Sequence, residues 1–268
     1  MEKSNVTMSH EEVAAATTNA ISNFPFLVSD YLSKHDFRAL CPEVVLFDMD
    51  GVLYDSMPNH AKAWRESMAK FGIEMTREDA YATEGQRGVD TIRQMVKLQQ
   101  GRDIDESEAQ RMYDEKSRLF HLMPQPPMMP GAIELMEQIS QAHIGIGVVT
   151  GSGQRPLIGR LLRDYGAFLD EAHIVTAYDV KLGKPNPDPY LMGLRKAGGL
   201  KPWQALVVEN APLGVAAGVA ASIFTICINT GHLPVSLFQQ QGANLILDSM
   251  QELCQQWPEF HFGKAIVS

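Results

Sequence analysis

The strongest constraint on the fold is an alternation of short apolar runs with helical patterns. Five runs are rich in Val, Ile and Leu and too short for helices, which is typical of strands buried on both faces. Helical patterns at residues 155–165, 187–197 and 212–221 separate several of them. This alternation predicts an α/β domain with a mainly parallel sheet. The predicted strands are residues 44–47, 144–149, 205–208, 223–228 and 245–247.

One long stretch interrupts the alternation, because it contains helical signals and no strand pattern. Pro58 can open a helix that ends at Gly72, and further helical spacing continues to the proline-rich segment near residue 124. We therefore expect a helical cap inserted directly after the first strand. The expected division is an N-terminal extension at residues 1–40, an α/β core at 41–57 and 130–268, and a cap at 58–129.

Chemically capable side chains follow the predicted strands. In open α/β sheets, ligands bind beyond the carboxyl ends of the strands, so the residues directly after each strand form one candidate site. Carboxylates, an amide, a hydroxyl and a lysine on one rim can hold Mg²⁺ and a phosphoryl group together, because such oxygen ligands suit Mg²⁺ rather than Zn²⁺. The set consists of Asp48, Asp50, Thr150, Gly151, Ser152, Lys184, Glu209 and Asn210.

These side chains have roles that follow from their charge and geometry. Asp48 can attack phosphorus if Mg²⁺ and Lys184 reduce its repulsion by the phosphate oxygens. Asp50 lies two residues further along, points to the same side, and can act as a general acid and base. The Thr150 hydroxyl and the backbone N–H groups that follow it can cradle the phosphoryl oxygens.

Composition limits the partners of the chain. It has 23 basic and 32 acidic residues, a formal net charge of −9, and its basic residues are scattered, which disfavours a nucleic-acid partner. The three cysteines show neither a paired framework nor a metal-binding spacing. No window resembles a signal peptide or a membrane span. We therefore expect a monomer in the cytoplasm with a small phosphorylated substrate.

The motif order resembles that of a known family. DMDGV at residues 48–52, Thr150, the Lys184–Pro185 loop and the Glu209–Asn210 pair occur in the order of the four motifs of the haloacid dehalogenase superfamily. The helical insertion resembles the C1 cap of its β-phosphoglucomutase-like subgroup. This resemblance covers residues 42–250 and implies a Rossmann-like core with an all-helical cap.

The resemblance also implies a role for each motif residue. The first aspartate would become an aspartyl phosphate, the second would be the general acid and base, and the threonine and lysine would bind the transferring phosphoryl group. Asn210 stands where many relatives have a second acid. The implied Mg²⁺ ligands are the Asp48 side chain, the Asp50 backbone carbonyl, and Glu209 or Asn210, with Mg²⁺ as the cofactor.

The cap loop TEGQRG at residues 83–88 departs from the β-phosphoglucomutase pattern. Glu84 replaces a lysine, Gly88 takes the place of an arginine, and Arg87 lies one residue early. An acid that faces a phosphate pocket is unfavourable unless a cation lies between them. Glu84 could therefore ligate the Mg²⁺ of a metal-bound substrate, and Glu84 with Tyr113 resembles a pair in the inorganic pyrophosphatases of this subgroup. Pyrophosphate is accordingly the leading substrate predicted from the sequence.

Other interpretations remain open for the cap residues and for the whole chain. His60 matches a histidine of β-phosphoglucomutases, so a mutase or a sugar-phosphate phosphatase is an alternative. A catalytically silent protein that binds a phosphorylated metabolite is another. Glu84 could be a solvated acid at a helix end, Tyr113 a packing residue, and Arg87 a partner of Asp90. The candidate substrate-binding residues are His60, Glu84, Arg87, Tyr113, Gly151 and Ser152.

Overall fold

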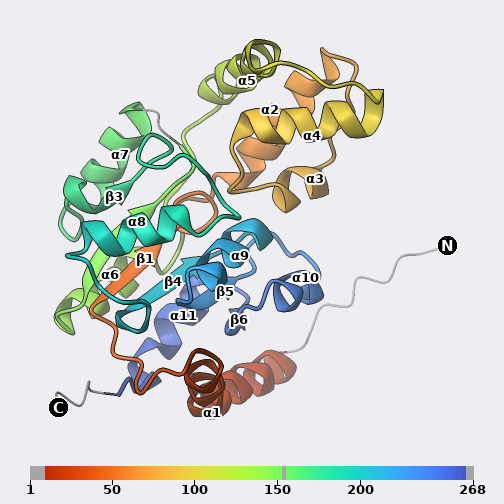
Figure 1. Cartoon of the computed structure of the whole chain (residues 1–268). Coiled ribbons are helices and arrows are strands. Elements are labelled where there is room, and N and C mark those ends of the chain that lie inside the picture. Colours follow the sequence, from red (N-terminus) through yellow and green to blue (C-terminus); the bar gives the residue numbers. More distant parts are fainter. Residues whose placement is uncertain (1–9, 153–154, 264–268) are drawn as a thin grey trace.

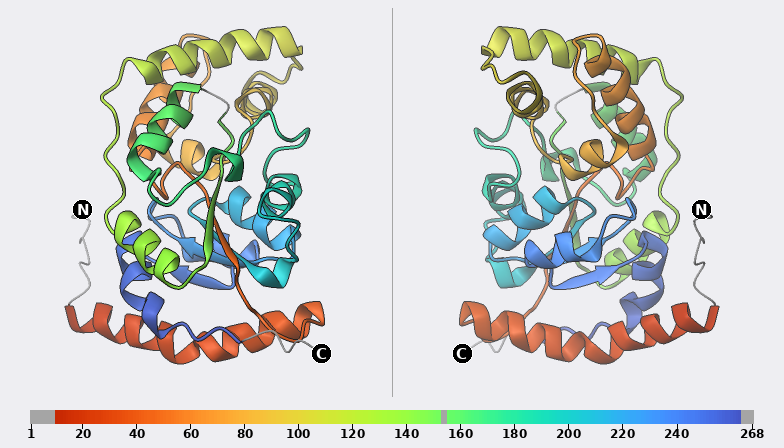
Figure 2. Two further views of the ribbon diagram at one scale, coloured as in Figure 1. Left: turned by 90° about the vertical axis from the view of Figure 1, so that its left-hand side faces the viewer. Right: turned by 90° about the vertical axis from the view of Figure 1, so that its right-hand side faces the viewer.

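The computed structural model describes residues 10–152 and 155–263, and within them a six-stranded sheet lies between two layers of helices (Figures 1 and 2). Each strand runs parallel to its neighbours, in the order β3-β2-β1-β4-β5-β6. Strand β1 lies near the centre of the sheet. Strands β2 and β3 extend the sheet on one side of β1, and β4, β5 and β6 extend it on the other. The strands are β1 (Val44–Phe47), β2 (Gly145–Val149), β3 (Ile174–Val175), β4 (Ala205–Glu209), β5 (Phe224–Ile228) and β6 (Leu245–Leu247).

The predicted α/β fold with a parallel sheet is confirmed, with one more strand than the sequence indicated. That strand, β3, has only two residues and therefore leaves no readable pattern. Strand β1 shows why the apolar runs in the sequence are continuous, because its side chains are buried on both faces of the sheet. Val45 and Phe47 pack into the cluster on one face of the sheet, whereas Val44 and Leu46 pack into the cluster on the other.

Helices cover both faces of the sheet. Helices α1, α6, α7 and α11 contribute to one core cluster, and α8 and α9 contribute to the opposite one, with α10 beside α9. Short 3₁₀ turns occur at Glu171–His173, Pro202–Gln204 and Trp257–Glu259. The core helices are α1 (His10–His35), α6 (Ala132–Gln141), α7 (Arg155–Tyr165), α8 (Asp188–Lys196), α9 (Pro212–Ala220), α10 (Val235–Gln240) and α11 (Met250–Gln256).

Helix α1 packs against the core at the end of the sheet away from the cap (Figure 2). The ring of Phe24 stacks on Phe260 with the centroids 4.2 Å apart, and Tyr31 meets Phe224 edge-on at 5.4 Å. The Tyr31 hydroxyl also donates a hydrogen bond of 2.8 Å to the carbonyl of Ser222. The N-terminal extension thus adds to the core. Residues 1–9 of that extension and 264–268 of the predicted core lie outside the described residues.

The cap is a helical unit between β1 and α6 (Figure 1). The two segments that connect it to the core run side by side, since the Asp55 N–H donates to the Pro127 carbonyl and the Met129 N–H to the Leu53 carbonyl. Tyr81 packs on the core at Gly231, where a Cβ would lie 2.5 Å from its ring. The cap helices are α2 (Met57–Ala69), α3 (Arg77–Ala82), α4 (Gly88–Gln100) and α5 (Glu106–His121).

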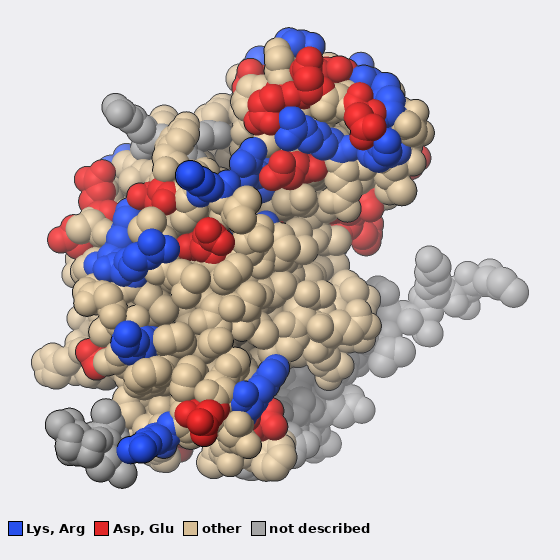
Figure 3. All heavy atoms as spheres, viewed as in Figure 1, with Lys and Arg blue, Asp and Glu red and all other residues tan. Residues whose placement is uncertain are grey.

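The surface in Figure 3 shows how charge is distributed on one face. Basic and acidic side chains alternate over the cap, where Arg93 pairs with Glu106 and Arg102 with Glu108. Residues 210–247 contain no Asp, Glu, Lys or Arg, and the surface near α9 and α10 is largely uncharged. All three cysteines have free thiols. No helix in the described ranges is long and apolar enough to cross a membrane.

Candidate active site

A cavity of about 60 Å³ lies where the cap meets the carboxyl ends of β1 and β2. The parallel register of these strands brings the residues that follow them to the same edge of the sheet. The core forms the floor of the cavity and the cap forms its roof, so groups between 10 and 92 positions apart in sequence face one another. Asp48, Asp50, Thr150, Gly151 and Ser152 line the floor, and His60, Glu84, Tyr113 and Lys116 are among the residues of the roof.

Asp48 lies on the floor, buried and paired with Lys184. The Lys184 Nζ donates to Asp48 Oδ1 at 2.6 Å and to the carbonyl of Val149 at 3.1 Å. Burial raises the pKa of Asp48 to about 7 despite this lysine, because Glu209 and Asp50 add negative charge nearby. Lys184 is thus directly paired with two of these three buried carboxylates, Asp48 and Glu209. This excess of negative charge is the environment in which a cation binds.

Glu209 and Asn210, which follow β4, differ in what their side chains already contact. Glu209 Oε1 accepts hydrogen bonds from Lys184 Nζ at 2.6 Å and from the Tyr190 hydroxyl at 2.5 Å. Asn210 Oδ1 is buried and has no hydrogen-bond partner among the described residues. Its Nδ2 lies so close to Gly51 that a Cβ there would be 2.0 Å away. A buried acceptor without a donor is characteristic of a ligand position, so Asn210 is the better candidate for the metal.

The donor set fits Mg²⁺. It would combine the Asp48 carboxylate, the Asp50 main-chain carbonyl and the Asn210 amide oxygen, which are all hard oxygen ligands. Within the described residues, no three His, Cys, Asp or Glu side chains are arranged as a metal cluster. A mixed set of one carboxylate, one carbonyl and one amide does not require such a cluster.

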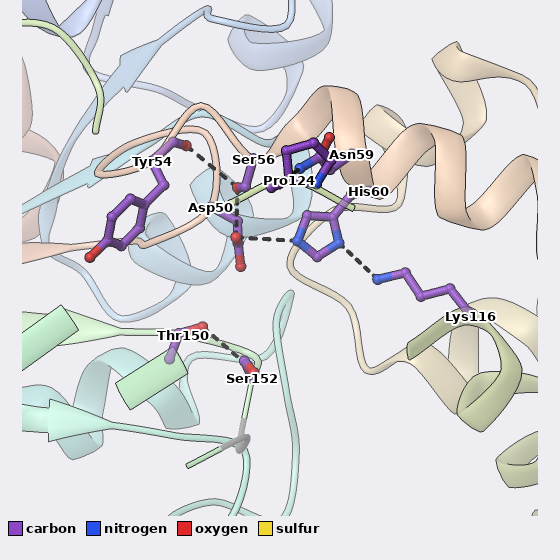
Figure 4. Close-up of polar contacts among 9 residues, drawn as sticks. All are labelled: Asp50, Tyr54, Ser56, Asn59, His60, Lys116, Pro124, Thr150 and Ser152. Atoms are coloured by element: carbon purple, nitrogen blue, oxygen red, sulfur yellow. Dashed lines mark hydrogen bonds and ion pairs between the residues drawn. The ribbon is translucent and has the colours of Figure 1, made fainter. Parts of the chain in front are cut away.

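Asp50 is held by residues at the entry to the cap (Figure 4). Its Oδ1 accepts a hydrogen bond of 2.6 Å from the Ser56 hydroxyl and contacts His60 Nε2 at 3.2 Å. Lys116 Nζ lies 2.7 Å from the other ring nitrogen, Nδ1. An ammonium group can only donate, so Nδ1 must accept and Nε2 must carry the proton that is donated to Asp50. Lys116, His60 and Asp50 therefore form a directed chain of hydrogen bonds from α5 to the floor.

The protonation of this chain follows from its burial and charges. Burial and the Lys116 ammonium lower the pKa of His60, so the imidazole is neutral near pH 7. Burial opposes ionisation of Asp50, yet hydrogen bonds from His60 and Ser56 and the charge of Lys116 hold its pKa below the usual value. Asp50 is therefore a carboxylate in the substrate-free site.

The roof contains one acid, Glu84, and one base, Lys116, each of which affects the pKa of the other. Burial and the Asp50 and Asp48 carboxylates raise the pKa of Glu84 to about 8, against the effect of Lys116. Burial lowers the pKa of Lys116 to about 8, against the effect of Glu84. The Lys116 Nζ also lies 5.0 Å from the ring centroid of Trp64 and 5.2 Å from that of Phe120. The roof is thus aromatic and contains one acid and one base rather than a cluster of bases.

The loop after β2 completes the floor. Thr150 is buried, and its Oγ1 accepts a hydrogen bond of 3.1 Å from the Ser152 N–H (Figure 4). Gly151 lies under the cap loop, where an added Cβ would be 3.5 Å from the carbonyl oxygen of Gly85. The Thr150 hydroxyl and the start of this loop therefore face the same cavity as Asp50.

The sequence match agrees with this geometry. Residues 42–222 match the family model described as a haloacid dehalogenase-like hydrolase. The chain belongs to the haloacid dehalogenase-like hydrolases. The resemblance inferred from the four motifs is therefore confirmed.

Relatives of this haloacid dehalogenase-like hydrolase act on organic phosphates, according to their names. The chain is 32% identical to hexitol phosphatase A of Escherichia coli over 78% of its own length and 91% of the relative. It is 30% identical to validoxylamine A 7'-phosphate phosphatase of Streptomyces hygroscopicus, over 82% and 98% of the two chains. A solved structure from Bacteroides vulgatus, provisionally assigned as a β-phosphoglucomutase, shares 44% identity and a TM-score of 0.85, covering 89% and 96%.

Eight of the twelve predicted residues line one cavity. Lys184, Glu209 and Asn210 are buried without lining this cavity, although Lys184 contacts Asp48 on its floor. Arg87 does not line the cavity either but points to other residues of the cap, 3.3 Å from Asp90 and 3.7 Å from Glu106. The structure thus agrees with the alternative from the sequence in which Arg87 pairs with Asp90 instead of contacting the substrate. Tyr113 lines the cavity and also packs on Gly88, where a Cβ would be 2.0 Å from its ring. Tyr113 is therefore both a packing residue and a wall of the site.

Lys116 was not predicted from the sequence, and its presence in the cavity weakens the pyrophosphate prediction. That prediction treated Glu84 as an acid without a counter-charge in the cap, whereas Lys116 supplies one. The named relatives of this hydrolase are likewise phosphatases of organic esters. A signal for Lys116 was present, because it lies on one helical face with Tyr113 and Phe120.

Proposed function

We propose that this hydrolase is a Mg²⁺-dependent phosphatase of a small sugar or polyol monophosphate. The observation that carries this proposal is the composition of the roof, where one acid, Glu84, and one base, Lys116, lie beside Trp64 and Phe120. Carboxylate and ammonium groups together bind hydroxyl groups as acceptor and donor, and aromatic rings pack on the apolar faces of sugars. A second phosphate group would need several positive charges, and Lys116 is the only lysine or arginine among the described residues that line the cavity.

The proposed reaction has two steps on the floor of the cavity. The Asp48 carboxylate attacks phosphorus, the bond to the ester oxygen breaks, and Asp50 gives a proton to the leaving alkoxide. Asp50 then takes a proton from water, which attacks the aspartyl phosphate and releases inorganic phosphate. Lys184 and Thr150 hold the phosphoryl oxygens. Asp48, the Asp50 main-chain carbonyl and Asn210 would hold Mg²⁺, which would supply positive charge to offset the charge of the phosphoryl group.

Asp50 must be protonated for the first step although it is ionised in the free site. The negative charge of an arriving phosphate ester raises the pKa of a neighbouring carboxyl group, so Asp50 can take up the required proton when substrate binds. In the second step Asp50 acts as a general base and must be ionised. Its low pKa favours this role, because the carboxylate held by Ser56 and His60 is already deprotonated.

A panel of phosphate esters with Mg²⁺ tests the proposed substrate class. The panel contains sorbitol 6-phosphate, fructose 1-phosphate, glycerol 3-phosphate and pyrophosphate, and kcat/KM is measured from phosphate release. We expect at least one sugar or polyol phosphate to exceed pyrophosphate by about 10-fold or more. A clear preference for pyrophosphate would contradict the proposal. Activity that Asp48→Asn abolishes would also exclude a silent binding protein.

A β-phosphoglucomutase is the second candidate, favoured by the 44% identity with the Bacteroides vulgatus structure. The cap loop argues against it, because Glu84 and Gly88 stand where that subgroup has a lysine and an arginine. Conversion of β-glucose 1-phosphate to glucose 6-phosphate, primed with the 1,6-bisphosphate, separates the two candidates. We expect slow release of inorganic phosphate and no mutase turnover.

A further inference from the structure

Tyr190 is a fully buried tyrosine that the proposed reaction does not use. It lies in the first turn of α8, and its hydroxyl donates a hydrogen bond of 2.5 Å to Glu209 Oε1. Its ring centroid lies 5.2 Å from the Lys184 Nζ. Burial and the Glu209 carboxylate raise the pKa of Tyr190 well above its usual value, so the hydroxyl keeps its proton and remains a donor.

The carboxylate that Tyr190 contacts is fixed from several sides. Glu209 Oε2 accepts a hydrogen bond of 3.1 Å from the Asn210 N–H. The first turn of α9 closes over it, since a Cβ on Gly214 would lie 2.0 Å from Oε1 and 2.2 Å from Oε2. Glu209 therefore has little room to rotate. The negative charge on its Oε1 is balanced by the two groups that donate to it, the Tyr190 hydroxyl and the Lys184 ammonium.

Lys184 has no spare donor in this arrangement. Its three N–H groups match three acceptors, namely Asp48 Oδ1, Glu209 Oε1 and the Val149 carbonyl. A phosphoryl group on Asp48 must take one of these donors if the lysine is to contact it. Glu209 is the acceptor best able to release the lysine, because Tyr190 and the Asn210 N–H still donate to its carboxylate.

We propose that the Tyr190 hydroxyl is a positioning group that lets Lys184 turn from Glu209 toward the phosphoryl group on Asp48. This inference rests on the proposed aspartyl-phosphate chemistry, although it does not depend on the identity of the substrate. Without the hydroxyl, the buried Oε1 keeps Lys184 as its remaining side-chain donor. Lys184 then stays on Glu209 and does not reach the phosphoryl group, because a buried carboxylate with too few hydrogen-bond donors is strongly disfavoured.

Tyr190→Phe tests this role, since phenylalanine keeps the ring beside Lys184 and removes only the hydroxyl. We expect kcat/KM for the best ester of the panel to fall by about 10- to 100-fold. Tyr31→Phe is the matched control, because Tyr31 is equally buried and its hydroxyl donates to the Ser222 carbonyl at the other end of the sheet. That control should lower the melting temperature and change kcat/KM by less than about 2-fold.

A double-mutant cycle with Glu209→Gln tests whether Tyr190 acts through the carboxylate. A neutral amide does not attract the lysine, so in the Glu209→Gln background Tyr190→Phe should change kcat/KM by less than about 2-fold. An equal loss in both backgrounds, no loss in the wild-type background, or the same kinetic loss in Tyr31→Phe would overturn the inference.

A binding measurement separates this inference from the proposed function. Calorimetric titration of the Mg²⁺-loaded protein with inorganic phosphate requires no turnover. We expect Tyr190→Phe to weaken phosphate binding by about 10-fold while Tyr31→Phe leaves it unchanged. If no ester of the panel is hydrolysed but this difference is found, the proposed function fails and the role of Tyr190 stands. Equal phosphate affinity in all three proteins contradicts the role of Tyr190, whatever the substrate.

Discussion

Replacing Lys116 with methionine tests the chain of hydrogen bonds that leads from α5 to Asp50. Methionine has a similar length and fills the space beside Trp64 and Phe120, but it has no ammonium group. His60 Nδ1 then loses the donor that lies 2.7 Å away, and nothing from α5 keeps the Nε2 proton directed at Asp50. We therefore expect slower proton transfer in both steps of the reaction.

The size of the effect follows from the kind of hydrogen bond that is lost. A hydrogen bond that involves a charged group contributes about 1.5–3 kcal/mol. In the transition state this corresponds to a loss of about 10- to 150-fold in kcat/KM. The free energy of unfolding should change little, because removing a buried ammonium also removes the cost of burying it.

Lys116 also gives the variant a pH signature. Its pKa is lowered from 10.5 to about 8 in the folded protein, so between these values the unfolded chain holds a proton that the folded protein has released. Stability due to this group therefore rises with pH across that window, and Lys116→Met removes the rise. Chemical denaturation at pH 8 and pH 10 measures the difference.

The assay is kcat/KM for p-nitrophenyl phosphate with Mg²⁺, measured for the wild type, Lys116→Met and Lys62→Met. Lys62 is a matched control, because it is an exposed lysine of α2 that lies 4.0 Å from Glu66. We expect the control to retain its activity. If Lys116→Met stays within about 2-fold of the wild type, the ordering of Asp50 through His60 is refuted.

Three further substitutions have expected outcomes. Asp48→Asn should lower kcat by about 10⁴-fold or more, because the nucleophile is lost; its unfolding free energy at pH 8 should not fall, since the buried charge is removed. Gly51→Ala should weaken Mg²⁺ binding and cost about 1–3 kcal/mol of stability, because φ is +80° and the new Cβ would meet Asn210. Titration calorimetry and thermal melting measure both effects, and normal Mg²⁺ affinity would exclude Asn210 as a ligand. Arg87→Ala should leave kcat/KM within about 2-fold, since Arg87 pairs with surface acids outside the cavity.

The floor of the site was predictable because it depends on the order of elements along the chain. A strand buried on both faces is readable from its composition, and in a parallel sheet the residues after each strand must gather at one edge. Asp48, Thr150 and Asn210 could therefore be placed together before the structure was known. Strand β3 escaped detection because two residues cannot display a period.

The roof was not predictable in the same way. Whether an acid in the cap loop has a counter-charge depends on how α5 packs against α2, which sequence spacing alone does not determine. Lys116 and Glu84 are 32 positions apart, and their mutual effect arises only from the folded cap. Tyr190 escaped for a related reason, because an apolar helical face does not reveal where a tyrosine hydroxyl points.

The packing of α1 has a consequence for how the chain is made. Phe24 packs against Phe260, and Tyr31 against Phe224; both partners are synthesised about 200 residues later in the chain. At ribosomal speeds of about 5–20 residues per second, α1 leaves the ribosome roughly 10–45 s before those partners exist. Helix α1 therefore waits with its aromatic face exposed to solvent or to chaperones. This part of the core can close only after the segment that contains Phe224 and Phe260 has been translated.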